Sequence, residues 1–236
     1  MSDNSTITPT RSWFGFLSGA PSQPSTTPSI QPPAASPPPA NELLPKLLDP
    51  AQLEAKRIKD EKDCQRCEKW KGKLVKNSAM VRFMIDNLER VGCPFDESHF
   101  ICTPCDTNRA GGFSPAVGVV LCQDKFLDRQ HMEDTMTHEL VHAFDHCTTN
   151  VNWKSPQQHA CAEIRAVNLS GECKFTREFR RGNWQVARHH QACVRRRAIL
   201  GVKMLPGCAE GTVAEDAVRV VWDSCFNDTT PFDEIP

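Results

Sequence analysis

Five consecutive residues, His138-Glu139-Leu140-Val141-His142, have the types and the spacing for metal-assisted hydrolysis. On an α-helix, positions i and i+4 lie on one face, so the two imidazoles can bind one zinc ion. The glutamate beside the first histidine can reach a zinc-bound water and take its proton. The motif therefore predicts a Zn²⁺ hydrolase with Glu139 as general base, and the competing interpretation is a solvated helix face.

A hydrolytic zinc site needs a third protein ligand and one open position for water. Glu163 lies on the next expected helix, which would give the His₂Glu arrangement of many zinc peptidases. Asp145 is the rival, but two histidines and an aspartate on one unbroken helix converge poorly on one ion. We expect Glu163 to be the third ligand, with Asp145 as the alternative ligand or as an acceptor that orients a histidine.

The developing oxyanion needs a second donor besides zinc, and the chain has no tyrosine to supply it. The residue types leave five candidates open, namely His159, Arg165, Arg188, His189 and His190. A basic run, Arg195-Arg196-Arg197, is either a solvated helix face or a contact for anionic lipid headgroups or an acidic partner.

Two helices must position the proposed ligands. Apolar residues recur at spacings of three and four across 128–147 and predict the motif helix; they are Met132, Met136, Leu140, Val141 and Phe144. The next helix should begin with Ser155 as N-cap, Pro156 in the first turn and Gln158 completing a capping box. It should end near Ser170, before Gly171.

The remaining periodicity predicts four more helices and two strands. The helices are expected at 43–76, 78–91, 186–200 and 213–225, and the strands at 99–103 and 116–122, the second after a turn at Gly111-Gly112. If 116–122 is an edge strand beside the cleft, it can take an extended substrate by strand addition; a buried central strand is the alternative. The predicted fold is α+β and zincin-like, mainly helical with a small sheet.

Composition limits the organisation and the function classes. The 236 residues allow one substantial domain plus tails, and a net charge of −1 argues against nucleic-acid binding. No apolar run is long enough to span a bilayer, so a membrane role would be peripheral. Residues 1–45 are rich in Pro, Ser and Thr and are predicted to be a disordered extension, which leaves 46–236 as the folded domain.

Twelve cysteines in one domain favour disulfides and an oxidising compartment. The alternative is structural zinc at Cys64-x-x-Cys67 and Cys102-x-x-Cys105, which leaves the other cysteines unexplained. The stretch Trp13–Leu17 is too short for a secretory signal, whereas a Ser/Thr-rich start with Arg11 is closer to a mitochondrial targeting segment. Oxidation without a secretory signal fits the mitochondrial intermembrane space.

Beyond the zinc motif, longer segments carry a family resemblance. The segments His138-Glu-Leu-Val-His142-Ala-Phe-Asp145, Ala160-Cys-Ala-Glu163-Ile-Arg-Ala and Asn168-Leu-Ser-Gly-Glu-Cys173 resemble the mitochondrial inner-membrane metalloproteases that process ATP synthase subunit a. Further matches lie at 186–189, 193–198, 222–226 and 231–234. The resemblance covers residues 64–236.

The resemblance implies a peripheral inner-membrane protein that faces the intermembrane space and removes the N-terminal propeptide of ATP synthase subunit a. It also implies a separable chaperone role in assembling the membrane sector of ATP synthase. His138 and His142 match the family's zinc ligands and Glu139 its catalytic glutamate, while Glu163 and Asp145 both lie in matched segments. Two alternatives remain, a catalytically idle zinc-binding assembly chaperone and a zinc-ribbon nucleic-acid-associated protein.

Overall fold

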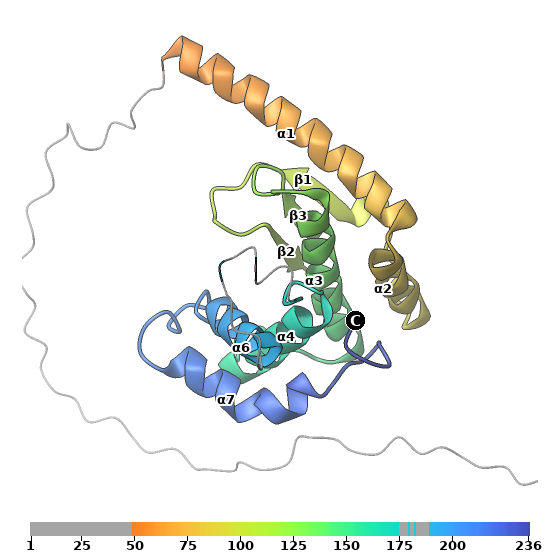
Figure 1. Ribbon diagram of the computed structural model, residues 1–236, viewed down its shortest axis with the longest axis vertical. Helices are drawn as coiled ribbons and strands as arrows, with labels where there is room; N and C mark the ends of the chain where they lie inside the picture. The colour runs from red at the N-terminus through yellow and green to blue at the C-terminus, as the bar shows by residue number, and fades with distance from the viewer. Residues whose placement is uncertain (1–48, 175–178, 180–181, 183–188) are drawn as a thin grey trace, which may run out of the picture. The chain divides into compact units, whose positions relative to one another are not determined.

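Helix α3, Arg129–Thr148, carries the HExxH motif and packs against a small sheet and against helices α2 and α4 (Figure 1). The computed structural model describes residues 49–174, 179, 182 and 189–236. These belong to one compact unit, residues 48–236. The predicted disordered extension, residues 1–45, lies outside the described residues.

The sheet has three strands in the order β1-β3-β2. Strand β1, Phe100–Thr103, is parallel to β3, Gly118–Cys122, and β2, Gly111–Ser114, is antiparallel to β3. Two expectations are therefore wrong. Gly111-Gly112 belongs to a strand, and the turn falls at 115–117. The strand expected at 116–122 is central, and β2 is the antiparallel edge.

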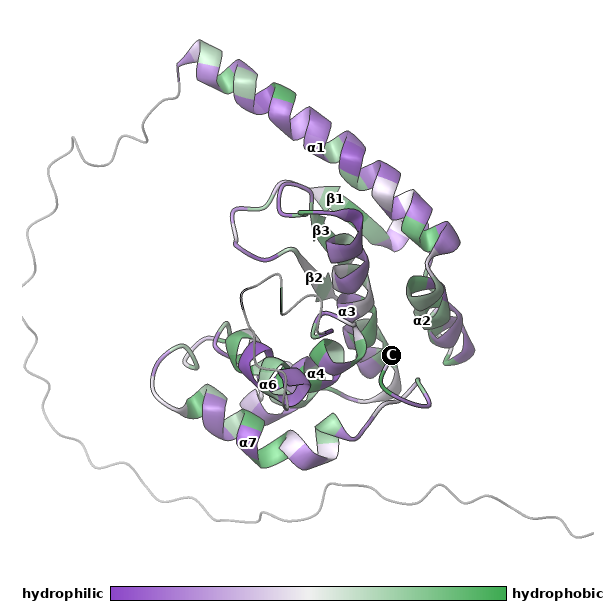
Figure 2. Cartoon of the chain, viewed as in Figure 1, coloured by the Kyte–Doolittle hydropathy of each residue, from purple (hydrophilic) through white to green (hydrophobic). Residues whose placement is uncertain are grey.

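Helices α1, Pro50–Asn77, and α2, Ala79–Arg90, precede the sheet, and Ser78 separates them as N-cap of α2. The expected helix at 43–76 thus begins at Pro50 in the described part, where Asp49 and Gln52 form a capping box. α1 is mostly polar, as its colouring in Figure 2 shows. Its buried residues form one stripe along the second half of the helix: Asp63, Cys67, Lys71 and Leu74.

Among the described residues, three helices follow α3. They are α4, Pro156–Leu169, α6, His189–Val202, and α7, Val213–Phe226, and α6 and α7 both pack on α4. Ser155 caps α4 as expected, but the predicted capping box is incomplete. The side-chain oxygen of Gln158 instead accepts from the backbone N–H of Asn152, at 2.6 Å. The expected start of α6 at residue 186 lies outside the described residues.

The apolar core has two clusters. One is formed by α1, α2, the sheet and α3, and the other by α4, α6 and α7. Helix α4 contributes to both, because Ala166 and Leu169 face the first cluster and Ile164 and Val167 the second. The contact between α3 and α4 is therefore where the two clusters meet. No helix in the described part of the chain combines the length and the apolar character needed to span a bilayer.

Ten of the twelve cysteines form five disulfides, which confirms that most are paired. The pairs are Cys67–Cys102, Cys93–Cys147, Cys105–Cys122, Cys161–Cys225 and Cys173–Cys193. Cys64 and Cys208 are free. The zinc-ribbon hypothesis is wrong, because Cys67, Cys102 and Cys105 are all engaged in disulfides.

We expect loss of the Cys161–Cys225 disulfide to lower the free energy of unfolding by about 4 kcal/mol, since it closes a loop with a sequence separation of 64. The double variant Cys161→Ser/Cys225→Ser should show this in denaturant unfolding. Cys64→Ser is the control and should leave the midpoint nearly unchanged, because Cys64 has no disulfide partner. An equal effect of both changes would contradict the pairing.

Candidate active site

Helix α3 presents the two histidines of the motif side by side. His138 Nε2 and His142 Nε2 lie 3.1 Å apart, and the two rings are nearly perpendicular, with centroids 4.8 Å apart. His142 and Glu139 are buried, and His138 is mostly buried. The helix turn predicted from the spacing therefore brings both ring nitrogens to one point.

Glu163 reaches the histidine pair from α4. Its Oε1 lies 3.6 Å from His142 Nε2, and its Oε2 lies 3.8 Å from His138 Nε2. One ligand atom from each of the three residues falls within 4.8 Å of the others, a grouping that can hold a metal ion. The structure thus brings together the three side chains that the sequence proposed as ligands.

A carboxylate that sequence reasoning missed orients His138. His138 Nδ1 lies 3.0 Å from Glu172 Oε1, and Glu172 also forms an ion pair with Arg197 of α6. Because a carboxylate accepts, Nδ1 carries the hydrogen of the neutral ring, and a metal ion that displaces the second proton would bind Nε2. Glu172 lies in the segment 168–173, which carries part of the family resemblance. Its separation of 34 residues from His138 does not by itself indicate this contact.

The charges at the site are strongly coupled. Burial alone would lower the pKa of His138, but the hydrogen bond to Glu172 and the nearby carboxylates raise it to about 9. Burial alone would raise the pKa of Glu163, but the hydrogen bond and charge of His142 and the neighbouring histidines lower it to about 2. Glu163 is therefore an anion at neutral pH, as a metal-binding carboxylate must be.

The candidate base, Glu139, lies under the edge strand of the sheet. Burial raises the pKa of Glu139, so its carboxyl group holds a proton more readily than an exposed glutamate does. Gly111 of β2 packs so closely over α3 that a Cβ there would lie 2.8 Å from Thr135 Cγ2 and 3.5 Å from Glu139 Oε1. Gly111, which the sequence predicts to lie in a turn, instead lets β2 approach the motif helix.

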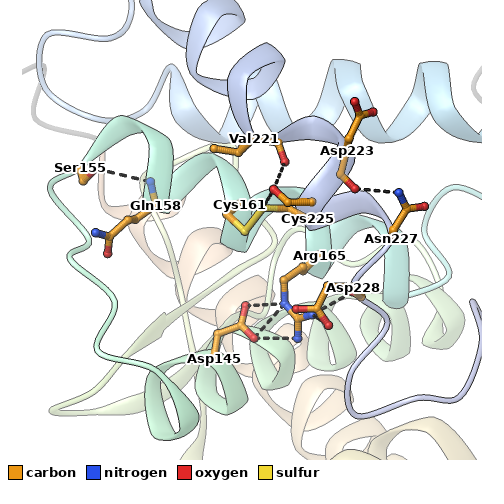
Figure 3. Close-up of a disulfide and its surroundings, with 11 residues drawn as sticks. Asp145, Ser155, Gln158, Cys161, Arg165, Val221, Asp223, Cys225, Asn227 and Asp228 are labelled. Atoms are coloured by element: carbon orange, nitrogen blue, oxygen red, sulfur yellow. Dashed lines mark hydrogen bonds and ion pairs between the residues drawn. A yellow bond between two sulfur atoms is a disulfide. The ribbon is translucent and has the colours of Figure 1, made fainter. Parts of the chain in front are cut away.

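Asp145, the rival ligand, is not part of this group and is engaged in an ion pair. Its carboxylate accepts from the Arg165 guanidinium at 2.9 to 3.2 Å, and Arg165 Nη1 also contacts Asp228 Oδ1 at 2.6 Å (Figure 3). Burial would lower the pKa of Arg165, but these two carboxylates raise it. The pair joins α3 to α4 beside the Cys161–Cys225 disulfide.

Of the five candidate oxyanion donors, the structure brings His159 to the site. His159 Nε2 lies 3.4 Å from Glu163 Oε1, and burial lowers the pKa of His159 so that the ring is neutral at pH 7. Arg165 is committed to its carboxylates, and His190 Nε2 lies 2.7 Å from Asn168 Oδ1. Arg188 lies outside the described residues.

Aromatic rings surround the outer side of the histidine pair. Trp153, from the loop between α3 and α4, lies against His142, His159 and His146, with ring centroids 5.7 to 6.5 Å apart. Phe113 of β2 lies 6.4 Å from the Trp153 ring. Trp153 thus links Phe113 of the edge strand to two of the histidines at the site, His142 and His159.

Gly201 of α6 is a second residue that sequence reasoning missed. A Cβ at this position would overlap the Glu163 side chain at Oε2 and Cδ. Glycine therefore allows α6 to lie directly against the carboxylate and restricts where it can point. A glycine inside a helical pattern was the available signal, because it lowers helix stability and often marks close packing.

Two imidazoles and a carboxylate that converge on one point, beside a buried glutamate, are typical of metal-dependent hydrolases. The chain belongs to the Peptidase M76 family, whose model matches residues 65–233.

Known proteins are similar to this chain over most of their own length. The chain is 49% identical over 175 residues to Mitochondrial inner membrane protease atp23 of Neosartorya fischeri, which covers 73% of this chain and 74% of the relative. It is 47% identical over 184 residues to Mitochondrial inner membrane protease ATP23 of Coccidioides immitis, covering 77% and 78%. No solved structure matches the chain.

We expect Gly201→Ala to weaken metal binding without weakening the fold. Alanine favours a helix over glycine by about 1 kcal/mol, but its Cβ must displace Glu163 from the histidines. Zinc affinity in a competitive chelator titration should fall roughly 10- to 100-fold, as when a ligand loses its support. Gly112→Ala is the matched control, since no atom lies within 4 Å of a Cβ there. If both variants kept the wild-type zinc affinity, the close packing of Gly201 on Glu163 would have no role in metal binding.

Proposed function

We propose that the protein is a zinc-dependent endopeptidase with a zincin-like fold, peripheral to the mitochondrial inner membrane on its intermembrane-space side. The observation that carries the proposal is the convergence of His138, His142 and Glu163 next to Glu139. An idle assembly chaperone would have no need for a buried glutamate beside the first histidine.

The donor set fits a zinc ion. Zinc ligands at about 2.0 to 2.1 Å in a tetrahedron are about 3.3 Å apart. Here the two Nε2 atoms are 3.1 Å apart, Glu163 Oε1 lies 3.6 Å from His142 Nε2, and Glu163 Oε2 lies 3.8 Å from His138 Nε2. His138 Nε2, His142 Nε2 and the Glu163 carboxylate would hold the ion. When bound, zinc supplies a Lewis acid and lowers the pKa of water to about 7.

The protein's own residues supply the proton transfers. Glu139 takes a proton from the attacking water, and its raised pKa lets it keep that proton until the leaving amine needs it. Neutral His159 is the candidate second donor to the oxyanion, because it is the donor side chain beside Glu163. Glu172 holds His138 in the tautomer that leaves Nε2 for the metal.

Strand β2 is the proposed substrate guide. It is one of the two edge strands of the sheet, and Gly111 brings it close to Glu139. An extended chain added to this edge gains main-chain hydrogen bonds whatever its side chains are, and passes the metal centre. Phe113 of the same strand and Trp153 would then contact the side chains nearest the cleaved bond.

The proposed substrate is the N-terminal propeptide of ATP synthase subunit a, and the second proposed role is as chaperone in assembling the membrane sector. Support comes from the family segments in the sequence and from relatives that are named mitochondrial inner membrane proteases. Five disulfides fit the oxidising intermembrane space.

We expect Glu139→Gln to abolish propeptide cleavage while zinc content and melting temperature stay at wild-type values. Glutamine has the same shape but cannot accept the proton of water, and loss of a general base typically costs roughly 100- to 10,000-fold in rate. Cleavage of a peptide that spans the propeptide junction measures the effect. Assembly of ATP synthase in cells carrying this variant should persist if the chaperone role is separate, and near-normal cleavage would refute the protease assignment.

The ligand assignment is tested by a pair of carboxylate variants. Glu163→Ala should lose more zinc affinity than the roughly 10- to 100-fold that removing an outer hydrogen-bond partner costs. The zinc affinity of Asp145→Asn should stay within about tenfold of the wild-type value. Its melting temperature should fall, because the change weakens a buried ion pair with Arg165. Zinc titration and thermal unfolding of both variants decide the matter, and the reverse ranking would make Asp145 the ligand.

A further inference from the structure

Helix α1 carries a free thiol one turn before a disulfide. Cys67 of α1 is bonded to Cys102 of β1, and Cys64 has no disulfide partner. Residues three apart on a helix lie on the same face, with about 5 to 6 Å between their Cβ atoms. Cys64 is therefore a direct neighbour of Cys67 on α1. The Cys-x-x-Cys spacing, which is typical of zinc sites, here presents one bonded and one free sulfur.

The free thiol and the disulfide share one groove. The groove has a volume of about 540 Å³, and its lining includes Asp60 and Cys64 from α1 as well as Cys102 and Gln123 from the sheet side. Cys67, by contrast, is 1% exposed and belongs to the first apolar cluster. The accessible end of the disulfide is therefore Cys102, and it lines the same groove as the free thiol.

Hydrogen bonds on both sides of Cys64 hold this part of α1 against the sheet. Gln123 Nε2 donates to the Asp60 backbone oxygen at 3.0 Å, and the Gln123 backbone oxygen accepts from Arg66 Nη2 at 3.3 Å. The backbone N–H of Gln123 donates to the Thr103 backbone oxygen at the end of β1, also at 3.0 Å. Cys64 lies between Asp60 and Arg66 in the sequence, so these contacts keep its thiol beside the end of β1.

We propose that Cys64, Cys67 and Cys102 form a thiol–disulfide exchange site, in which Cys102 can be bonded to either cysteine of α1. The Cys64 thiolate attacks Cys102 Sγ, so that the Cys64–Cys102 bond forms and the Cys67–Cys102 bond breaks. Cys67 leaves as a thiolate and takes up the proton that Cys64 has lost. The number of disulfides does not change, so the step needs no oxidant and no reductant.

Burial decides which pairing prevails. A thiolate released at Cys67 would lie in the apolar cluster, where burial penalises the charged form, whereas Cys64 is partly exposed. The Cys67–Cys102 pairing is therefore the resting form, and Cys64 is its reactive thiol. An external disulfide or alkylating reagent would enter at Cys64, because Cys67 is inaccessible.

The exchange would change how α1 is anchored. Three residues span about 4.5 Å along a helix, so the covalent attachment of β1 would move by that distance toward the N-terminal end of α1. The other described disulfides have no free cysteine within one helical turn along the chain. The proposed exchange is therefore specific to the Cys67–Cys102 disulfide.

The test counts free thiols in folded variants that are unfolded without reductant in the presence of N-ethylmaleimide. The wild type should have two, Cys64 and Cys208. Cys67→Ser should have one, because Cys64 takes its place, and mapping of non-reduced peptides should show a Cys64–Cys102 crosslink.

Cys93→Ser is the matched control and should have three free thiols. It releases Cys147, which has no free cysteine nearby along the chain to replace its partner. Three free thiols in Cys67→Ser would overturn the proposal, because Cys64 would then leave Cys102 unpaired. One free thiol in both variants would also overturn it, since the cysteines would then pair again whatever their position.

The wild type decides the matter if Cys67→Ser does not fold. In folded protein held at pH 8, peptide mapping should detect a minor Cys64–Cys102 crosslink beside the resting pairing, and prior alkylation of Cys64 should abolish it. Absence of the minor crosslink would overturn the proposal. These measurements require neither zinc nor peptide cleavage, so their outcome is independent of the proposed function.

Discussion

The buried ion pair between Asp145 and Arg165 is the interaction on which the site depends, because it joins the two helices that carry the proposed ligands. Asp145 follows His142 on α3, and Arg165 follows Glu163 on α4, so the pair fixes the register between imidazoles and carboxylate. Removing one partner of a buried pair leaves an uncompensated charge, which costs about 3 to 5 kcal/mol. Asp228 extends the pair to the C-terminal segment, so the end of the chain also restrains both helices.

Helix α6 supports the same site from the other side. Arg197 pairs with the glutamate that orients His138, and Gly201 lets the helix lie against Glu163. The centre is thus enclosed by three helices, while strand β2 covers the base. Because the two apolar clusters meet at α3 and α4, packing on either side restricts the ligands. Functional side chains generally need such support to stay within about 0.5 Å of a productive geometry.

Much of the architecture was predictable because it follows from local signals. Periodic apolar residues and a proline after Ser155 located α3 and α4, and helix geometry favoured Glu163 over Asp145. The roles of Glu172 and Gly201 were not predictable, since each depends on a helix that is remote in sequence. Gly111 was misassigned because a glycine pair is typical of turns, whereas here the missing side chain permits close packing of a strand.

The disulfides have a consequence for when the enzyme can act. Cys147 follows His142 on α3, Cys161 precedes Glu163 on α4, and Cys173 adjoins Glu172, so three of the crosslinks end beside residues of the metal site. A newly made chain with all thiols reduced lacks these covalent restraints on α3 and α4. Oxidation would therefore serve as the activation step that a removable prosegment provides in secreted proteases, and it would keep the peptidase latent until it reaches a compartment that forms disulfides.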